Sequence, residues 1–250
     1  MKNNKIYMRI MTLTIVIALI LTTAANAVTF TDISNHWAKD YILKVAEKGL
    51  VTGYSNGTFK PENNVTVLES LIIMSRLYDI NDDIKEQILD KYKPVIRKMN
   101  NAEEYEWAFE GLSIALELGI VSENGLKSMF EEKTISKDAS KEEIAVLLTK
   151  AIFLGDEAKQ LKVYPLPFAD VAEISKEARP YLYIMYDKKI VNGDQKNKIN
   201  PKDNIKRAEM AAMIDRTYEY IIDNNVKPKF ENYKQTTTIK GIITEVSTGG

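Results

Sequence analysis

The chain repeats itself at a spacing of 140 residues, and this repetition limits its fold more than any other feature. Pro61 recurs as Pro201, and Glu69 recurs as Glu209, with no gap between them. The same register pairs further positions, namely Tyr41 with Tyr181, Leu50 with Ile190, Gly53 with Gly193 and Val65 with Ile205. One unit of about 50 residues buries too little apolar surface to fold alone, so the copies are predicted to share one core.

A third, weaker copy lies halfway between these two. Trp37 and Trp107 are 70 residues apart, and each is followed by alanine. The Thr66-x-x-Glu69 pattern meets Ser140-x-x-Glu143 at a spacing of 74, which implies a four-residue insertion in the middle copy. The sequence therefore predicts three copies with a period near 70 residues.

Each copy is predicted to form a helix, a turn-rich loop and a second helix. The second helix begins with a capping box in two copies, since Thr66 and Ser140 are followed three residues later by glutamate. Its apolar stripe comprises Leu68, Leu71 and Ile72 in copy one, Ile144, Leu147, Leu148 and Ala151 in copy two, and Ala208, Ala211 and Ala212 in copy three. The small third stripe favours three helices packed around a common axis in an all-α fold.

Both ends of the chain differ from the repeats. Lys2, Lys5 and Arg9 precede an apolar run over residues 10–21, and Ala25-Asn-Ala follows it, as in a secretory signal peptide. An uncleaved anchor is the alternative, disfavoured because a membrane span needs about 20 apolar residues. Residues 236–250 have the alternation of a β-strand and form either a β-prone tail or the start of a further domain.

These patterns divide the chain into five segments. They are a signal peptide (1–27), repeat 1 (28–80), a linker helix with a degenerate repeat 2 (81–155), repeat 3 (156–220) and a linker or tail (221–250).

Composition excludes several classes of function. Lys plus Arg is 34 and Asp plus Glu is 35, a balance that excludes a strongly basic nucleic-acid binder and general attraction to anionic membranes. Without cysteine and with His36 as the one histidine, the chain lacks the residues of most zinc and Ser-His sites. No nucleophile elbow, phosphate loop or dinucleotide motif is present. We therefore expect no metal, no cofactor, no catalytic residue and no enzyme activity.

The copies resemble the S-layer homology (SLH) motif, which occurs in threes on bacterial surface proteins. The residues that carry the resemblance are Phe30-x-Asp32, His36-Trp-Ala38, Gly53-Tyr54, Gly57-Thr-Phe59, Pro61, Val65-Thr-Val-Leu-Glu69, Phe168-x-Asp170, Gly193-Asp194, Pro201 and Ile205-Lys-Arg-Ala-Glu209. The resemblance implies a pseudo-threefold spindle with a central three-helix bundle and grooves between repeats. It also implies noncovalent binding to a secondary cell wall polysaccharide, often pyruvylated and linked to peptidoglycan, on a bacterium with a Gram-positive-type wall. The sequence leaves the oligomeric state open.

The resemblance also implies which residues contact the glycan. The family's second helix opens with Ile-Thr-Arg-Ala-Glu, whose arginine binds the ligand, and this chain has Val67, Lys141 and Arg207 there. Lysine keeps the charge without a bidentate grip, and valine keeps neither. We therefore expect the best groove at Arg207, a weaker one at Lys141 and an impaired one in copy one, so that Arg207→Ala weakens wall binding more than Lys141→Ala.

Further residues are candidates for the same grooves, with Glu209 among them as the glutamate of the helix-opening motif. Asp32 and Asp170 line a groove or cap a local turn. Trp37 and Trp107 stack on sugars or pack in the core, and core packing is favoured. Gly53 and Gly193 admit a ligand or, as favoured, serve a positive φ in the turn.

Two other functions compete with a wall-binding module in its own right. The chain is alternatively the N-terminal part of a structural S-layer protein or adhesin. It is otherwise the anchor of a secreted polysaccharide-degrading enzyme. In both cases the working domain lies beyond residue 250.

Overall fold

The computed structural model describes residues 28–233, so the predicted signal peptide and the β-prone segment 236–250 lie outside the described residues. Within that range every regular element is a helix, and no helix combines the length and apolar character needed to cross a membrane. The elements are α2 (Lys39–Glu47), α3 (Val67–Ser75), α4 (Asp82–Ile96), η1 (Ala102–Ala108), α5 (Phe109–Glu117), α6 (Glu123–Glu131), α7 (Lys141–Ala151), α8 (Gly155–Gln160), η2 (Val171–Glu173), α9 (Arg179–Asp187) and α10 (Arg207–Asp223). The predicted all-α class is confirmed.

The first helices of the three repeats, α2, α5 and α9, begin and end alike. They follow Ala38, Ala108 and Ala178, each of which is buried. After each helix the backbone takes a positive φ, at Gly49 (71°), Gly119 (69°) and Lys189 (59°). Glycine adopts this conformation without strain, whereas Lys189 adopts it against its Cβ.

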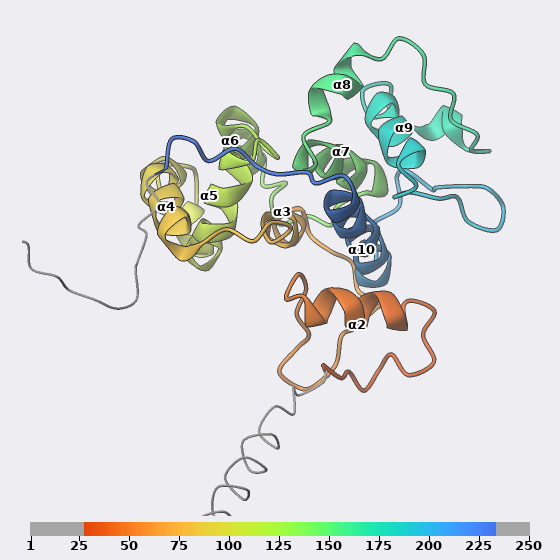
Figure 1. The fold of residues 1–250 in the computed structure, drawn as a ribbon, viewed down its shortest axis with the longest axis horizontal. Coiled ribbons are helices and arrows are strands. Elements are labelled where there is room, and N and C mark those ends of the chain that lie inside the picture. Colours follow the sequence, from red (N-terminus) through yellow and green to blue (C-terminus); the bar gives the residue numbers. More distant parts are fainter. Residues whose placement is uncertain (1–27, 234–250) are drawn as a thin grey trace, which may run out of the picture.

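The second helices, α3, α7 and α10, begin at a ring of backbone hydrogen bonds. Val65 N donates to Ile205 O (3.1 Å), Ile205 N donates to Ala139 O (2.9 Å), and Ala139 N donates to Val65 O (2.8 Å). Equivalent residues of the three repeats are thereby joined in a closed cycle, and the three helices lie at the centre of the molecule (Figure 1). This ring gives the fold its pseudo-threefold symmetry.

The capping boxes predicted for two of these helices are present. Thr66 Oγ1 accepts from Glu69 N, and Ser140 Oγ accepts from Glu143 N, while each glutamate accepts the capping residue's own N–H. In repeat 3 the ammonium of Lys206 cannot accept a hydrogen bond, but Glu209 Oε2 still accepts from Lys206 N (2.9 Å). Half of the box therefore survives there.

Each first helix packs against the second helix of the preceding repeat. Helix α5 packs on α3, α9 packs on α7, and α2 packs on α10, so the first helix of the chain covers the last one (Figure 1). Met74, Leu148 and Ile214 occupy the same position in the three central helices, and all three are fully buried. The repeats therefore share one hydrophobic core, as their size predicts.

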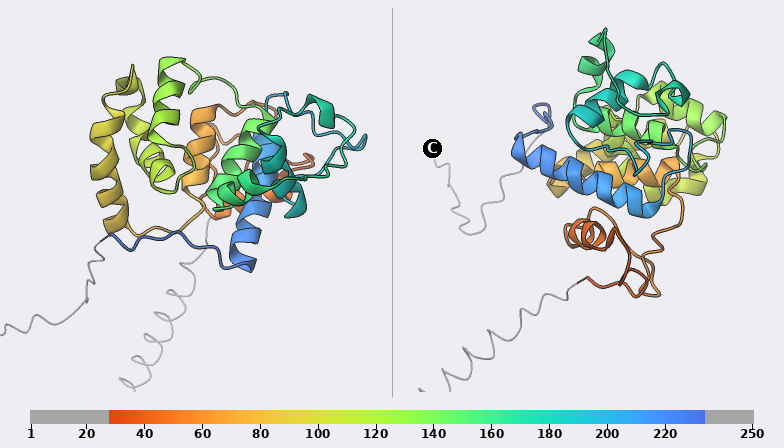
Figure 2. Two further views of the ribbon diagram at one scale, coloured as in Figure 1. Left: turned by 90° about the horizontal axis from the view of Figure 1, so that it is seen from above. Right: turned by 90° about the vertical axis from the view of Figure 1, so that its right-hand side faces the viewer.

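Additions outside the repeats cover one side of the spindle. Helix α4, which follows the predicted linker helix, packs on α5, and the segment after α10 runs across to it (Figures 1 and 2). Lys91 Nζ of α4 bonds Glu117 Oε2 of α5 (2.7 Å) and Tyr233 Oη (3.4 Å). This cluster holds the end of the described chain against the body.

Repeat 2 departs from the predicted turn-rich loop. Helix α6 stands in its place, capped by Ser122, whose hydroxyl accepts from Gly125 N. Leu126 and Phe130 on α6 are buried, so the middle repeat closes its own surface with a helix. The residues that differ from the other copies, Glu123 among them, form this helix, and a helix needs no glycine turn.

Candidate functional site: two equivalent inter-repeat grooves

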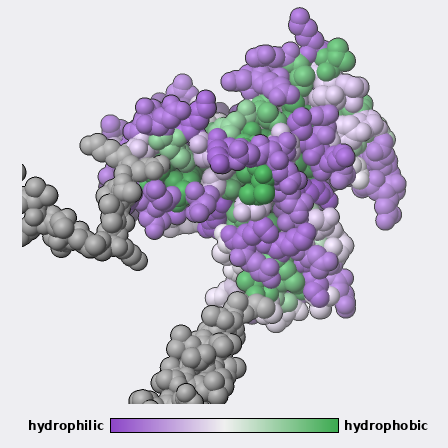
Figure 3. Space-filling view, in the orientation of Figure 1, coloured by the Kyte–Doolittle hydropathy of each residue, from purple (hydrophilic) through white to green (hydrophobic). Residues whose placement is uncertain are grey.

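A groove lies between repeats 2 and 3, and we name it the Lys141 groove. Its cavity has a volume of about 760 Å³. It is lined by the start of α7 (Lys141, Ala145), the loop 190–200, the α10 face (Glu209, Ala212, Met213, Arg216) and Trp37. Figure 3 shows hydrophilic side chains on the outer loop and apolar surface in the seams between helices. Polar groups thus rim an apolar floor, an arrangement typical of ligand pockets.

Four of the predicted site residues meet in the Lys141 groove, namely Lys141, Glu209, Gly193 and Trp37. Lys141 Nζ bonds Glu209 Oε1 across the repeat boundary at 2.7 Å. Both side chains are partly exposed, so the ion pair stands at the wall of the groove and is accessible to a ligand.

The lining of this groove carries more positive than negative charge. Lys141, Lys196, Lys198 and Arg216 face Asp194 and Glu209. Asp194 Oδ1 accepts from the backbone N–H of Lys196 (2.8 Å) and of Lys198 (2.9 Å), and the bond from Lys198 is the main cause of its lowered pKa. One carboxylate is therefore engaged in holding the loop, and the groove suits an anion although the whole chain is nearly neutral.

The pseudo-equivalent groove between repeats 3 and 1 contains Arg207, and we name it the Arg207 groove. Arg207 Nε donates to Phe59 O (2.9 Å), and Nη2 donates to Thr52 O (2.8 Å). The guanidinium also lies over the rings of Phe59 (4.4 Å) and Tyr54 (5.1 Å). Arg207 thus ties α10 to the loop of repeat 1, and most of its hydrogen-bonding capacity toward this end of the groove is already used.

Asp32 and Asp170 hold turns. Asp32 accepts from Phe59 N (2.8 Å) and Lys60 N (2.7 Å), and Asp170 accepts from Ile199 N (3.2 Å) and Asn200 N (2.7 Å). Desolvation alone would raise the pKa of Asp32, but these N–H donors outweigh it and lower the pKa. Of the two predicted roles, the structure shows the turn-capping one, which shapes the loops that line both grooves.

The favoured core packing of the two tryptophans is wrong. Trp37 is 61% exposed and Trp107 is 69% exposed, because the inward position belongs to the alanine that follows each of them. Trp37 lines the Lys141 groove, and Trp107 lines a cavity at the far end of the Arg207 groove. Each groove therefore has one exposed indole.

The positive φ expected at Gly53 and Gly193 is also wrong, since neither residue is in the left-handed region. A Cβ on Gly53 would lie 2.1 Å from Phe30 Cε1 and 2.8 Å from Thr58 O. A Cβ on Gly193 would lie within 3.1 Å of Asn197 atoms. Glycine is required at both positions because the chain itself approaches closely.

The third junction, between repeats 1 and 2, differs from the other two. Val67 is 5% exposed, and its N–H donates to Lys137 O (2.9 Å). The position of the groove tryptophan holds Glu177 in repeat 3, by the same spacing that relates Trp37 to Trp107. This junction lacks both the cation and the indole of the other two.

The sequence stage missed one set of groove residues, the cations at Arg76, Lys150 and Arg216. The repeat spacing aligns them at the C-terminal part of α3, α7 and within α10, so a signal was present. Arg216 Nη1 donates to Ile190 O (3.1 Å), and its guanidinium lies 5.2 Å from the ring of Tyr41. Arg216 therefore links the wall of the Lys141 groove to the first helix of repeat 1.

Comparison with known proteins agrees with this architecture. The sequence model of the S-layer homology domain matches residues 29–66 and 167–211, which fall in repeats 1 and 3. The chain is an S-layer homology domain protein. Repeat 2, which carries the insertion and α6, is the most divergent of the three segments that the hydrogen-bonded ring joins.

Similar proteins include enzymes and surface-layer proteins. The chain is 27% identical to the amylopullulanase of Thermoanaerobacterium thermosulfurigenes over 74% of this chain and 9% of that protein. It is 23% identical to S-layer protein EA1 of Bacillus anthracis, over 86% of this chain and 23% of that protein. It is 44% identical to the outer membrane protein SlpA of Deinococcus radiodurans, over 18% of this chain and 4% of that protein. The chain thus spans less than a quarter of the length of each of these relatives.

Proposed function

We propose that this chain anchors a secreted protein noncovalently to the bacterial cell surface by binding an anionic wall glycan in its inter-repeat grooves. The observation that carries the proposal is the Lys141 groove, a cavity of about 760 Å³ with an exposed indole and an excess of cations. Relatives named as S-layer and outer membrane proteins support a place at the cell surface. A secondary cell wall polysaccharide bearing pyruvyl carboxylates, on a Gram-positive-type wall, fits this chemistry.

The chemistry of the groove matches such a ligand part by part. The flat face of Trp37 suits the apolar face of a sugar ring. Lys141 and Arg216 offer charge-assisted hydrogen bonds to a carboxylate. The side-chain amides of Asn192 and Asn200 suit hydroxyl groups, which both donate and accept. Binding requires no metal or cofactor in this scheme, and the module has no catalytic part in it.

The structure supports reversing the expected order of the two grooves. Arg207 spends its donors on Thr52 O and Phe59 O, so a ligand would have to displace bonds that hold repeat 1. Lys141 has one ionic partner, Glu209, and retains two of its three donors. We therefore propose the Lys141 groove as the principal site and assign Arg207 mainly to holding the repeats together.

The relatives also bear on the larger protein. The enzyme relatives match over the region that this chain comprises, and that region is a small part of each of them. A working domain after residue 250, either structural or polysaccharide-degrading, is therefore compatible with the anchoring role of these repeats.

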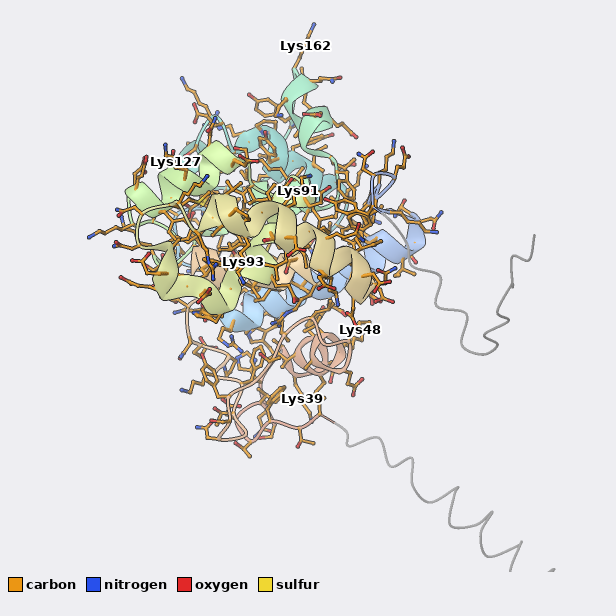
Figure 4. The ribbon with its side chains drawn as sticks, turned by 90° about the vertical axis from the view of Figure 1, so that its left-hand side faces the viewer. Lys39, Lys48, Lys91, Lys93, Lys127 and Lys162 are labelled. Atoms are coloured by element: carbon orange, nitrogen blue, oxygen red, sulfur yellow. The ribbon has the colours of Figure 1, made fainter. Side chains whose placement is uncertain are left out.

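Lys141→Ala is expected to weaken binding to purified wall sacculi about tenfold, since a charge-assisted hydrogen bond contributes about 1.5–3 kcal/mol. Co-sedimentation of the purified chain with sacculi over a range of wall concentrations measures this effect. Lys162→Ala is the matched control, because Lys162 is exposed and projects from the opposite end of the molecule (Figure 4). Equal binding by Lys141→Ala and Lys162→Ala would contradict the assignment of the Lys141 groove.

A further inference from the structure

A second cavity lies at the far end of the Arg207 groove, away from Arg207 itself. Its volume is about 690 Å³, and it is bounded by the end of α2, the C-terminal half of α3 and the start of α5. Trp107, Arg76 and Lys48 line it, together with Lys85, Asp79, Glu110 and Tyr218. Figure 4 shows Lys48 at the end of α2, where that helix approaches α10 and α4.

The cavity exists because one residue differs between pseudo-equivalent positions. In the Lys141 groove, Tyr41 lies beneath the guanidinium of Arg216. The repeat spacing places Gly111 of α5 where α2 has Tyr41 and α9 has Tyr181. A Cβ on Gly111 would lie 3.2 Å from Ile72 and 3.3 Å from Ser75, so α5 approaches α3 closely and no ring fills the space beside it.

Arg76 has lost the partners that its counterpart has. Arg216 donates to Ile190 O and lies over the Tyr41 ring. Arg76 is exposed, and among the described residues its guanidinium has no hydrogen bond, ion pair or ring contact. A guanidinium free of internal partners is available, with its five donors, to an anion that enters the cavity.

We propose that this cavity is a second, independent glycan site that takes a sugar acid, with the sugar ring on Trp107 and its carboxylate on Arg76. Lys48 adds positive charge at the rim, since its ammonium lies 5.5 Å from the Tyr218 ring and has no carboxylate partner in the described residues. Lys85 is paired with Asp82 and contributes less. The inference rests on the proposed function only for the choice of a sugar as ligand.

The chain's two tryptophans allow each site to be measured alone, because Trp37 lies in one groove and Trp107 in the other. In a Trp37→Phe background, Trp107 fluorescence is expected to change saturably with sodium glucuronate. Glucose with sodium chloride at equal ionic strength should bind at least about tenfold more weakly, because the charged bond is absent. Arg76→Gln in the same background should weaken glucuronate binding at least about tenfold while leaving the melting temperature unchanged, since Arg76 has no partner in the fold.

Three results would overturn the inference: no saturable change at Trp107, an equal response to glucose, or an unchanged response in Arg76→Gln. The converse background, Trp107→Phe, reports the Lys141 groove through Trp37. A response at Trp37 without one at Trp107 refutes the second site and leaves wall anchoring intact. A response at Trp107 that depends on Arg76 supports the second site even if the chain fails to bind walls.

Discussion

Leu148→Ala is expected to lower the free energy of unfolding by about 2–5 kcal/mol, the largest stability effect of any change considered for this chain. Leu148 is fully buried in α7 at the position shared with Met74 and Ile214, so the deletion leaves a cavity in the common core. The melting temperature should fall by roughly 10 °C, as expected for a protein of this size. Thermal unfolding followed by circular dichroism measures the change.

The same experiment tests whether the repeats share one core. Unfolding should remain a single transition that shifts as a whole, because each first helix packs on the second helix of another repeat. Val163→Ala is the control, since Val163 is 75% exposed and should shift the transition little. Two separable transitions, with one unaffected by Leu148→Ala, would show that the repeats fold independently.

Glu142→Gln is expected to destabilise the chain by about 2–3 kcal/mol at pH 7, since it removes the charge from several hydrogen bonds at once. Glu142 is 8% exposed and stands in α7 where α3 has Leu68. Its carboxylate accepts from Ser175 N (3.0 Å), Ser175 Oγ (2.7 Å) and the ammonium of Lys202. These contacts join repeats 2 and 3 beside the Lys141 groove.

The effect of Glu142→Gln should depend on pH. Burial alone would raise the pKa of Glu142, but the bonds from Lys202 and Ser175 outweigh it and lower the pKa below its ordinary value of 4.5. The folded state then binds the proton more weakly than the unfolded state, so the contribution is complete above about pH 4.5 and disappears as the pH falls through the folded-state value. Urea unfolding of both proteins between pH 7 and pH 3 measures the difference, and a pH-independent difference would contradict the account.

A paired replacement separates the ion pair from the packing at this position. Glu142→Leu with Lys202→Met should recover much of the lost stability, because apolar residues often replace a buried ion pair without cost. Leu68 already fills the equivalent position in α3. No recovery in the double variant would mean that the bonds to Ser175, not the charge pair, hold this junction.

Local signals in the sequence predicted much of the fold. The capping residues Thr66 and Ser140, and the buried stripe that includes Leu148, depend on neighbours within one helix, and the structure confirms them. The repeat spacing also placed equivalent residues correctly, as the hydrogen-bonded ring of Val65, Ala139 and Ile205 shows. A repeated sequence constrains tertiary structure because equivalent residues must occupy equivalent environments.

The grooves were harder to predict because they depend on contacts between distant segments. Periodicity placed Trp37 at the edge of the buried stripe but could not tell which side of that edge it occupies. The bonds from Arg207 to Thr52 and Phe59 span about 150 residues, and no local pattern announces them. The opening beside Arg76 follows from Gly111, whose meaning appears only when the two packed helices are compared with their counterparts.

The dependence of wall binding on the secondary polymer tests the central claim most directly. The purified chain is incubated with sacculi that are intact, stripped of the polymer, or treated to remove pyruvyl groups, and is then sedimented. The account predicts that most of the chain sediments with intact sacculi, and that removing the polymer or its carboxylates abolishes this, because the cations of the Lys141 groove lose their partner. Undiminished binding to stripped sacculi would contradict the account and point to peptidoglycan itself.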